Sequence, residues 1–191
     1  EIEKMGTRHF LGKSSEDTGN DYCLRKSTNP SLSKDFSKKH SDLHKWLKST
    51  HFGVLNHGTR DHMKSDFLRY LFCSLWAKAH KGDKSPSPNS KYFPNALAPA
   101  HANWESGNHA DRFRAIEGSQ VALTITSHLR KDGHAQIHFD PFQNRSLTVR
   151  EAARIQTFPD DYYFEGKRGW QFQQVGNAVP SFLAKQIALH V

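Results

Sequence analysis

The chain has 191 residues, which is enough for one domain or two small ones. Apolar residues make up 36% of it, so the hydrophobic core must be thin, and no stretch has the roughly 20 apolar residues that a membrane span needs. The formal charge of +8 favours a polyanionic partner, and two distant cysteines, Cys23 and Cys73, exclude a disulfide scaffold and a cysteine-based zinc site.

The first half of the chain holds two predicted helices. Residues 1–35 are polar and punctuated by glycine, so we expect irregular structure there. Apolar residues then recur at near-helical spacing between residues 33 and 50, which predicts a short basic helix. A stronger pattern predicts a second helix over residues 61–81, followed by an exposed loop at 84–90, where two prolines prevent regular hydrogen bonding.

A β-hairpin is predicted over residues 121–139. The run from Val121 to His128 is rich in β-branched residues, which favour a strand. Asp132 and Gly133 form an Asp-Gly pair typical of tight turns, and the segment from His134 to Phe139 would return as the second strand. The turn would then lie at an exposed tip.

Two further helices are predicted near the C-terminus. Thr148 and Glu151 have the spacing of a capping box, so a helix should run over residues 149–157 and stop before Pro159. A final helix should begin with Pro180 in its first turn. Its apolar residues, spaced four apart, are Leu183, Ile187 and Val191.

Two sequence blocks resemble a known family. RSLTVREAARIQTFPDDY at residues 145–162 and QVGNAVP at 174–180 closely resemble the ninth and tenth conserved motifs of DNA (cytosine-5) methyltransferases, in the same order and with the same short spacing. More weakly, ALTIT at 122–126 resembles the family's S-x-T-I-T segment, and residues 56–57 resemble an Asn-His pair found early in its target recognition regions. The resemblance covers about residues 54–191.

The resemblance implies roles for these motifs. The first would brace the recognition region against the catalytic core, although a capped and salt-bridged scaffold helix also explains its structural residues Arg150, Glu151 and Arg154. In the second, we expect Gly176 to permit a tight backbone before Asn177. The residues implied to border the S-adenosylmethionine pocket are Asn177, Ala178 and Val179, and Ser181 stands where the family often has a second proline.

The chain lacks the family's catalytic groups. The family's nucleophile is a cysteine that follows proline, whereas Cys23 follows Tyr22 and Cys73 follows Phe72. The sequence also has neither the F-x-G-x-G donor loop nor a Glu-Asn-Val segment. We therefore assign no catalytic residue here and expect a C-terminal part that is inactive alone. An N-terminal catalytic half, in the same gene product or in another chain, would complete the S-adenosylmethionine-dependent enzyme.

Duplex DNA is the expected partner. Basic side chains near the predicted hairpin turn could reach a groove, and a second basic run precedes the hairpin. The residues expected to contact DNA are His128, Arg130, Lys131, His134, Arg112 and Arg114. The other histidines match no compact set of metal ligands, so we predict no metal site.

The predicted fold class is mixed α/β, with α+β character within this fragment. Residues 1–53 would be a polar segment that is partly disordered or leads into the recognition region. Residues 54–140 would form an irregular helical and β target recognition region that ends in a hairpin. Residues 141–191 would pack on the catalytic domain and supply C-terminal elements of a doubly wound, Rossmann-like methyltransferase domain. The predicted setting is prokaryotic restriction-modification or defence, in the cytosol or nucleoid. The alternative is a non-catalytic DNA-binding or regulatory remnant. An RNA-binding protein is less favoured, because no aromatic stacking signature is present.

Overall fold

Two compact units make up the chain. The computed structural model describes residues 22–23, 41–48, 54–81, 87–88, 92–100, 104, 112–118 and 120–191. The first unit comprises Glu1–Ser15, Thr59–Thr124 and Asp132–Leu147, and the second comprises Glu16–Gly58, Ile125–Lys131 and Thr148–Val191. Each unit is therefore assembled from segments that are distant in sequence.

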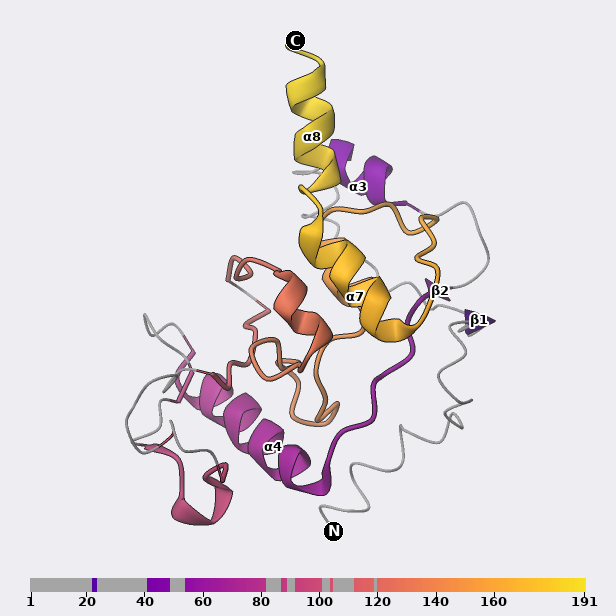
Figure 1. The fold of residues 1–191 in the computed structure, drawn as a ribbon. Helices are drawn as coiled ribbons and strands as arrows, with labels where there is room; N and C mark the ends of the chain where they lie inside the picture. Colours follow the sequence, from indigo (N-terminus) through magenta and orange to yellow (C-terminus); the bar gives the residue numbers. More distant parts are fainter. Residues whose placement is uncertain are drawn as a thin grey trace. The chain divides into compact units, whose positions relative to one another are not determined.

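Helix α4, Lys64–Ala79, dominates the first unit (Figure 1). It lies within the range predicted from periodicity. Tyr70, Cys73 and Ala77 are buried on this helix, whereas Met63 and Leu75 are exposed. The buried residues pack with aromatic and aliphatic side chains from later segments, namely Phe93, Phe113, Ala115 and Ile137. A short 3-10 helix, η2, follows at Asn95–Leu97.

The predicted hairpin over residues 121–139 is wrong. Residues 121–126 form no strand, and Ser127–Arg130 form a 3-10 helix, η3. Ile137 instead makes a parallel bridge with Ala115 and an antiparallel bridge with Ser146. Strand propensity was misleading because Ile125 and Leu129 are buried whereas Ser127, which would share their face in a strand, is exposed.

The second unit begins with short elements. Strand β1, Tyr22–Cys23, pairs antiparallel with β2, Val54–Leu55, with Tyr22 opposite Leu55. Helix α3, Ser41–Leu47, lies inside the range predicted for the basic helix, and much of the rest of that range falls outside the described residues. The irregular structure expected for residues 1–35 also lies outside them, apart from β1.

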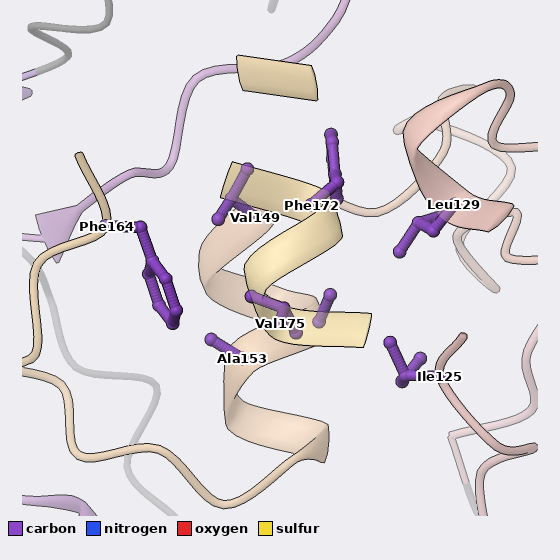
Figure 2. Close-up of a cluster of buried hydrophobic side chains, with 8 residues drawn as sticks. Ile125, Leu129, Val149, Ala153, Phe164, Phe172 and Val175 are labelled. Carbon is purple, nitrogen blue, oxygen red and sulfur yellow. The ribbon is translucent and has the colours of Figure 1, made fainter. Parts of the chain in front are cut away.

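Three helices complete the second unit: α6 at Val149–Ile155, α7 at Arg168–Asn177 and α8 at Ser181–Ala188. Helices α6 and α7 pack around one hydrophobic core, shown in Figure 2, to which η3 also contributes. The buried side chains of this core are Ile125, Leu129, Val149, Ala152, Ala153, Phe164, Phe172 and Val175. Both motif-bearing segments therefore meet in one core.

Helix α7 contradicts the expectation of a tight backbone before Asn177, because Asn177 is the last residue of the helix. Gln171, Phe172 and Val175 are buried at helical spacing, so residues 174–177 form the last turn of the helix. The helical pattern of apolar residues is weak in this segment because polar glutamines are interspersed among them. Helix α8 begins one residue after the predicted Pro180, which precedes its first turn.

Within the described residues, strand structure is confined to β1, β2 and the two isolated bridges. Helices are the main regular structure among these residues, and the predicted doubly wound sheet stays a prediction. None of the helices described is both long and apolar enough to cross a membrane.

Candidate functional site

Asn56 joins three segments of the second unit. Its backbone is left-handed, with φ 54°, a conformation that asparagine tolerates better than most residues. The side chain donates a 3.0 Å hydrogen bond from Nδ2 to the carbonyl of Phe164 and accepts one at Oδ1 from the Phe164 amide. The Asn56 carbonyl accepts a further bond from the Arg150 amide. Asn56 is therefore a buried structural brace.

Arg150 completes this brace as a buried cation. Nε donates to the carbonyl of Leu55 at 2.9 Å, Nη1 to Pro159 at 2.9 Å, and Nη2 to Tyr162. Burial lowers the pKa of Arg150 to about 10, and the charge of Asp160 is the largest influence that opposes this shift. Carbonyl oxygens satisfy this guanidinium, so the structure gives Arg150 a scaffold role.

The predicted capping box is confirmed. The Thr148 hydroxyl accepts from the Glu151 amide, and the Glu151 carboxylate accepts from the Thr148 amide. Nδ1 of His57 lies 2.9 Å from Oγ1 of Thr148, which links the Asn-His segment to the same cap. Arg154 pairs with Asp160 through two hydrogen bonds, and this pairing raises the pKa of Arg154.

Gln156 and Thr157 hold both sides of the turn from Asn177 to Pro180. Nε2 of Gln156 donates to the carbonyls of Val175 at 3.2 Å and Ala178 at 3.1 Å. Thr157 has φ 59°, and its Oγ1 accepts from the amide of Phe182, the second residue of α8. Asn177 and Val179 are exposed on this turn.

Ser181 and Trp46 strengthen the same junction. The Ser181 hydroxyl donates to the Thr157 carbonyl at 2.6 Å, and the Ser181 amide donates to the carbonyl of Gln156 at 3.2 Å. Nε1 of Trp46, on α3, also donates to Thr157, and its ring contacts Phe182. No local sequence pattern marks Gln156, Thr157 and Trp46, because their partners lie far away along the chain.

Gly176 is needed for close packing, which corrects the tight backbone expected from the sequence. It lies inside α7 and has no positive φ. A Cβ at this position would lie 2.3 Å from the Ser127 nitrogen and 2.4 Å from the Thr126 carbonyl carbon. The glycine therefore lets the start of η3 lie directly against α7.

The residues expected to bind DNA do not gather at a hairpin tip. His128, Arg130 and Lys131 belong to the second unit and are exposed. In the first unit, Nδ1 of His134 lies 2.9 Å from the Tyr70 hydroxyl, and Arg112 donates to Asp132 at 2.9 Å. Arg114 is partly buried there, and its amide donates to His134.

The first unit buries several titratable side chains. Nε2 of His62 accepts from the Ser146 amide at 3.2 Å, and burial lowers the pKa of His62 to about 3. Burial also lowers the pKa of His134, although Asp132 opposes this shift. Cys73 is fully buried on α4, which raises the pKa of its thiol to about 12. A thiol in this state is a poor nucleophile.

No metal centre is built from the residues that the structure describes: nowhere among them do three or more His, Cys, Asp or Glu side chains come together as ligands. The polar groups of the second unit instead hold its backbone segments in place.

Comparisons with known proteins are consistent with this motif geometry. The family model "C-5 cytosine-specific DNA methylase" matches residues 12–191. The type II methyltransferase M.Bpa9945I of Bacillus paralicheniformis is 55% identical over 78 residues, which is 41% of this chain and 18% of that protein. M1.HphI of Haemophilus parahaemolyticus is 35% identical over 135 residues, or 71% of this chain and 30% of that protein.

A third relative, type II methyltransferase M.PspPI of a Psychrobacter species, is 57% identical over 81 residues, which is 42% of this chain and 19% of that protein. The chain thus spans less than a third of the length of each of these relatives. No solved structure matches it.

Proposed function

We propose that this chain, which belongs to the C-5 cytosine-specific DNA methylase family, contributes DNA recognition and one side of the methyl-donor site to a complete DNA (cytosine-5) methyltransferase. The observation that carries this proposal is the junction between the two motif-bearing segments. Gln156 in the first segment donates to Val175 and Ala178 in the second, and both segments share one buried core.

The donor in this family is S-adenosylmethionine, which supplies the methyl group. Asn177, Ala178 and Val179 are the residues that we propose border it. The Asn177 amide can donate and accept hydrogen bonds, and the exposed Val179 offers apolar surface, so the turn suits a ligand with polar and flat apolar parts. Gln156 donates to the Ala178 carbonyl, so a hydrogen bond within the chain holds the turn in place. It can form one wall of a pocket.

The catalytic thiolate would come from an N-terminal catalytic half, in the same gene product or in another chain. Cys73 is buried with a raised pKa, and neither Cys73 nor Cys23 follows a proline as the family's nucleophile does. We therefore propose that the chain alone transfers no methyl group.

Helix α8 is the proposed surface for that half. Leu183 and Ile187 lie four residues apart on it and are about half exposed, and Val191 continues the same spacing. Burying these side chains against a catalytic domain would remove apolar surface from water. Duplex DNA would be contacted by His128, Arg130 and Lys131 of the second unit and by His134, Arg112 and Arg114 of the first.

The proposed setting is restriction-modification in the prokaryotic cytosol or nucleoid, in keeping with the type II methyltransferase names of the relatives. The competing proposal is a non-catalytic DNA-binding or regulatory remnant, in which the motifs are kept only for folding. The two proposals differ in whether the chain affects methyl-donor binding.

Calorimetric titration with S-adenosylmethionine tests the donor-binding role. The N-terminal half is titrated with and without this chain, and then with the Asn177→Ala variant. We expect the parent chain to tighten donor binding and Asn177→Ala to weaken it about tenfold, because one hydrogen bond to a charged ligand contributes about 1.5 to 3 kcal/mol. Lys78→Ala is the control, since this exposed residue lies on α4 of the first unit. Unchanged donor affinity on adding the chain would favour the remnant.

A further inference from the structure

Arg130 is fixed on the surface of the second unit by residues of α7. Its guanidinium carbon lies 3.6 Å from the ring centroid of Trp170, and Nη1 donates a 2.7 Å hydrogen bond to Oε1 of Gln173. The Arg130 side chain also passes over Gly169, where an added Cβ would lie 3.5 Å from Cγ. An exposed arginine normally samples many rotamers, whereas this one is held in a single orientation.

The stack lies outside the hydrophobic core. Arg130 is exposed and Trp170 is half exposed, while Leu129 and Phe172 fill the core beneath them. Of the guanidinium nitrogens of Arg130, only Nη1 donates a hydrogen bond to another described residue. Nε and Nη2 therefore remain available to an anionic ligand.

Further cations lie beside this stack. Lys131 directly follows Arg130 and is exposed. Lys167 precedes α7 and is also exposed, and its carbonyl accepts from the Trp170 amide at 2.8 Å, which places it one turn from the indole. Arg168 follows it. Against these four cations, the same short segments, residues 125–131 and 165–170, carry one carboxylate, Glu165.

Phosphates of a DNA backbone fit this arrangement better than base edges do. The Arg130 guanidinium is held over the indole and is hydrogen-bonded to Gln173, so in this position it does not extend into a groove as a base-reading arginine must. Cations spread along a surface gain affinity by releasing counterions from successive phosphates, without regard to sequence.

We infer that Arg130, Lys131, Lys167 and Arg168 form a phosphate-binding strip, ordered by Trp170, that holds duplex DNA by its backbone whatever its sequence. The inference rests on the proposed function for the choice of DNA as the polyanion. It adds the start of α7 to the residues that touch DNA and separates positioning contacts from sequence recognition.

The test measures the affinity of the whole chain for duplex DNA at several salt concentrations. In Lys131→Ala/Lys167→Ala, the slope of log affinity against log salt should flatten by about 0.9 for each phosphate that the protein no longer neutralises. The decrease in affinity should be the same for unrelated duplex sequences. The matched control is Lys64→Ala/Lys78→Ala, which removes the same charge from exposed positions on α4. The control should change the slope much less.

Trp170→Ala tests the ordering role, because it removes no charge. We expect a several-fold decrease in affinity, whereas Phe142→Ala, another exposed aromatic truncation, should leave affinity unchanged. If a thermal melt shows that Trp170→Ala unfolds the second unit, the Lys131→Ala/Lys167→Ala variant tests the strip instead. Both lysines are exposed, so replacing them should not unfold the chain.

The inference is overturned if the strip and control lysine variants behave alike, or if the strip binds duplex RNA more tightly than duplex DNA. Failure of the proposed function would look different. In that case the chain would bind duplex DNA through the strip, but it would never support donor binding or methyl transfer.

Discussion

Nε of Arg150 donates a 2.9 Å hydrogen bond to the carbonyl oxygen of Leu55, a residue 95 positions earlier in the chain. The same guanidinium reaches Pro159 and Tyr162, so one buried cation joins β2, α6 and the loop that follows α6. Arg150 of the family motif therefore holds this motif against β2 through hydrogen bonds.

Replacing Arg150 should destabilise the second unit severely. Arg150→Ala leaves three carbonyl oxygens without this donor, and each buried group left unpaired costs about 1 to 3 kcal/mol, so we expect the unfolding free energy to fall by about 3 kcal/mol or more. Chemical denaturation measures it. Arg150→Lys should be intermediate, because an ammonium cannot reproduce the planar fork. Lys167→Ala, at an exposed position, serves as the control. Equal destabilisation in both alanine variants would contradict the claim that the hydrogen bonds of Arg150 stabilise the second unit.

Gly176→Ala should be far more disruptive than Gly169→Ala, although both glycines lie on α7. A Cβ at Gly176 would lie 2.3 Å from the backbone of Ser127, whereas at Gly169 it would meet Arg130 at an ordinary 3.5 Å. We expect Gly176→Ala to cost about 1 to 3 kcal/mol or more through overpacking. Gly169→Ala should be neutral or stabilising, because alanine is the better helix former. Thermal melts of the two variants compare their stabilities. A Gly176→Ala variant as stable as the parent would refute the close approach of α7 to the backbone of Ser127.

Ser181→Pro should lower stability, even though proline is favoured at the start of a helix. The substitution removes the hydrogen bond from the Ser181 amide to Gln156 and the one from its hydroxyl to Thr157. Together these losses should lower the free energy of unfolding by about 1 to 3 kcal/mol. Ser181→Ala removes the hydroxyl bond alone and should cost about 1 kcal/mol. Urea denaturation measures both variants. A proline variant as stable as the parent would show that these bonds contribute little.

Acid should destabilise the first unit through His62. Its folded pKa is about 3 against an ordinary 6.5, so between these values the unfolded chain binds the extra proton. Stability should therefore fall as pH drops from 6.5 towards 3, by up to roughly 1.4 kcal/mol per pH unit. His62→Gln should flatten this dependence in denaturation curves measured across that range. Replacing the exposed His190 is the control, and an unchanged slope in His62→Gln would exclude His62 as the cause.

The parts of the fold that depend on neighbouring residues could be predicted from the sequence, whereas those that depend on distant partners could not. The capping box of Thr148 and Glu151 was predictable because its hydrogen bonds close over three residues. The hairpin was not, since Ile137 pairs with Ala115 and Ser146 instead of with the β-branched run. Strand propensity depends on such pairing.

The candidate site shows the same division. The sequence drew attention to Asn177 and Gly176, but the residues that support them became visible only in three dimensions. Gln156 and Thr157 act through backbone groups about twenty residues away, and no local pattern marks such contacts. The left-handed backbone of Asn56 was compatible with its residue type, yet its side chain is hydrogen-bonded to Phe164, 108 residues later in the chain.

The most direct test of the central claim is a methyl-transfer assay. The chain is incubated with duplex DNA and labelled S-adenosylmethionine, alone and together with the N-terminal catalytic half, and 5-methylcytosine is measured by mass spectrometry. We predict no 5-methylcytosine with the chain alone, none or very little with the N-terminal half alone, and abundant product when both are present. Product formed by this chain alone, or full activity of the N-terminal half without it, would contradict the account.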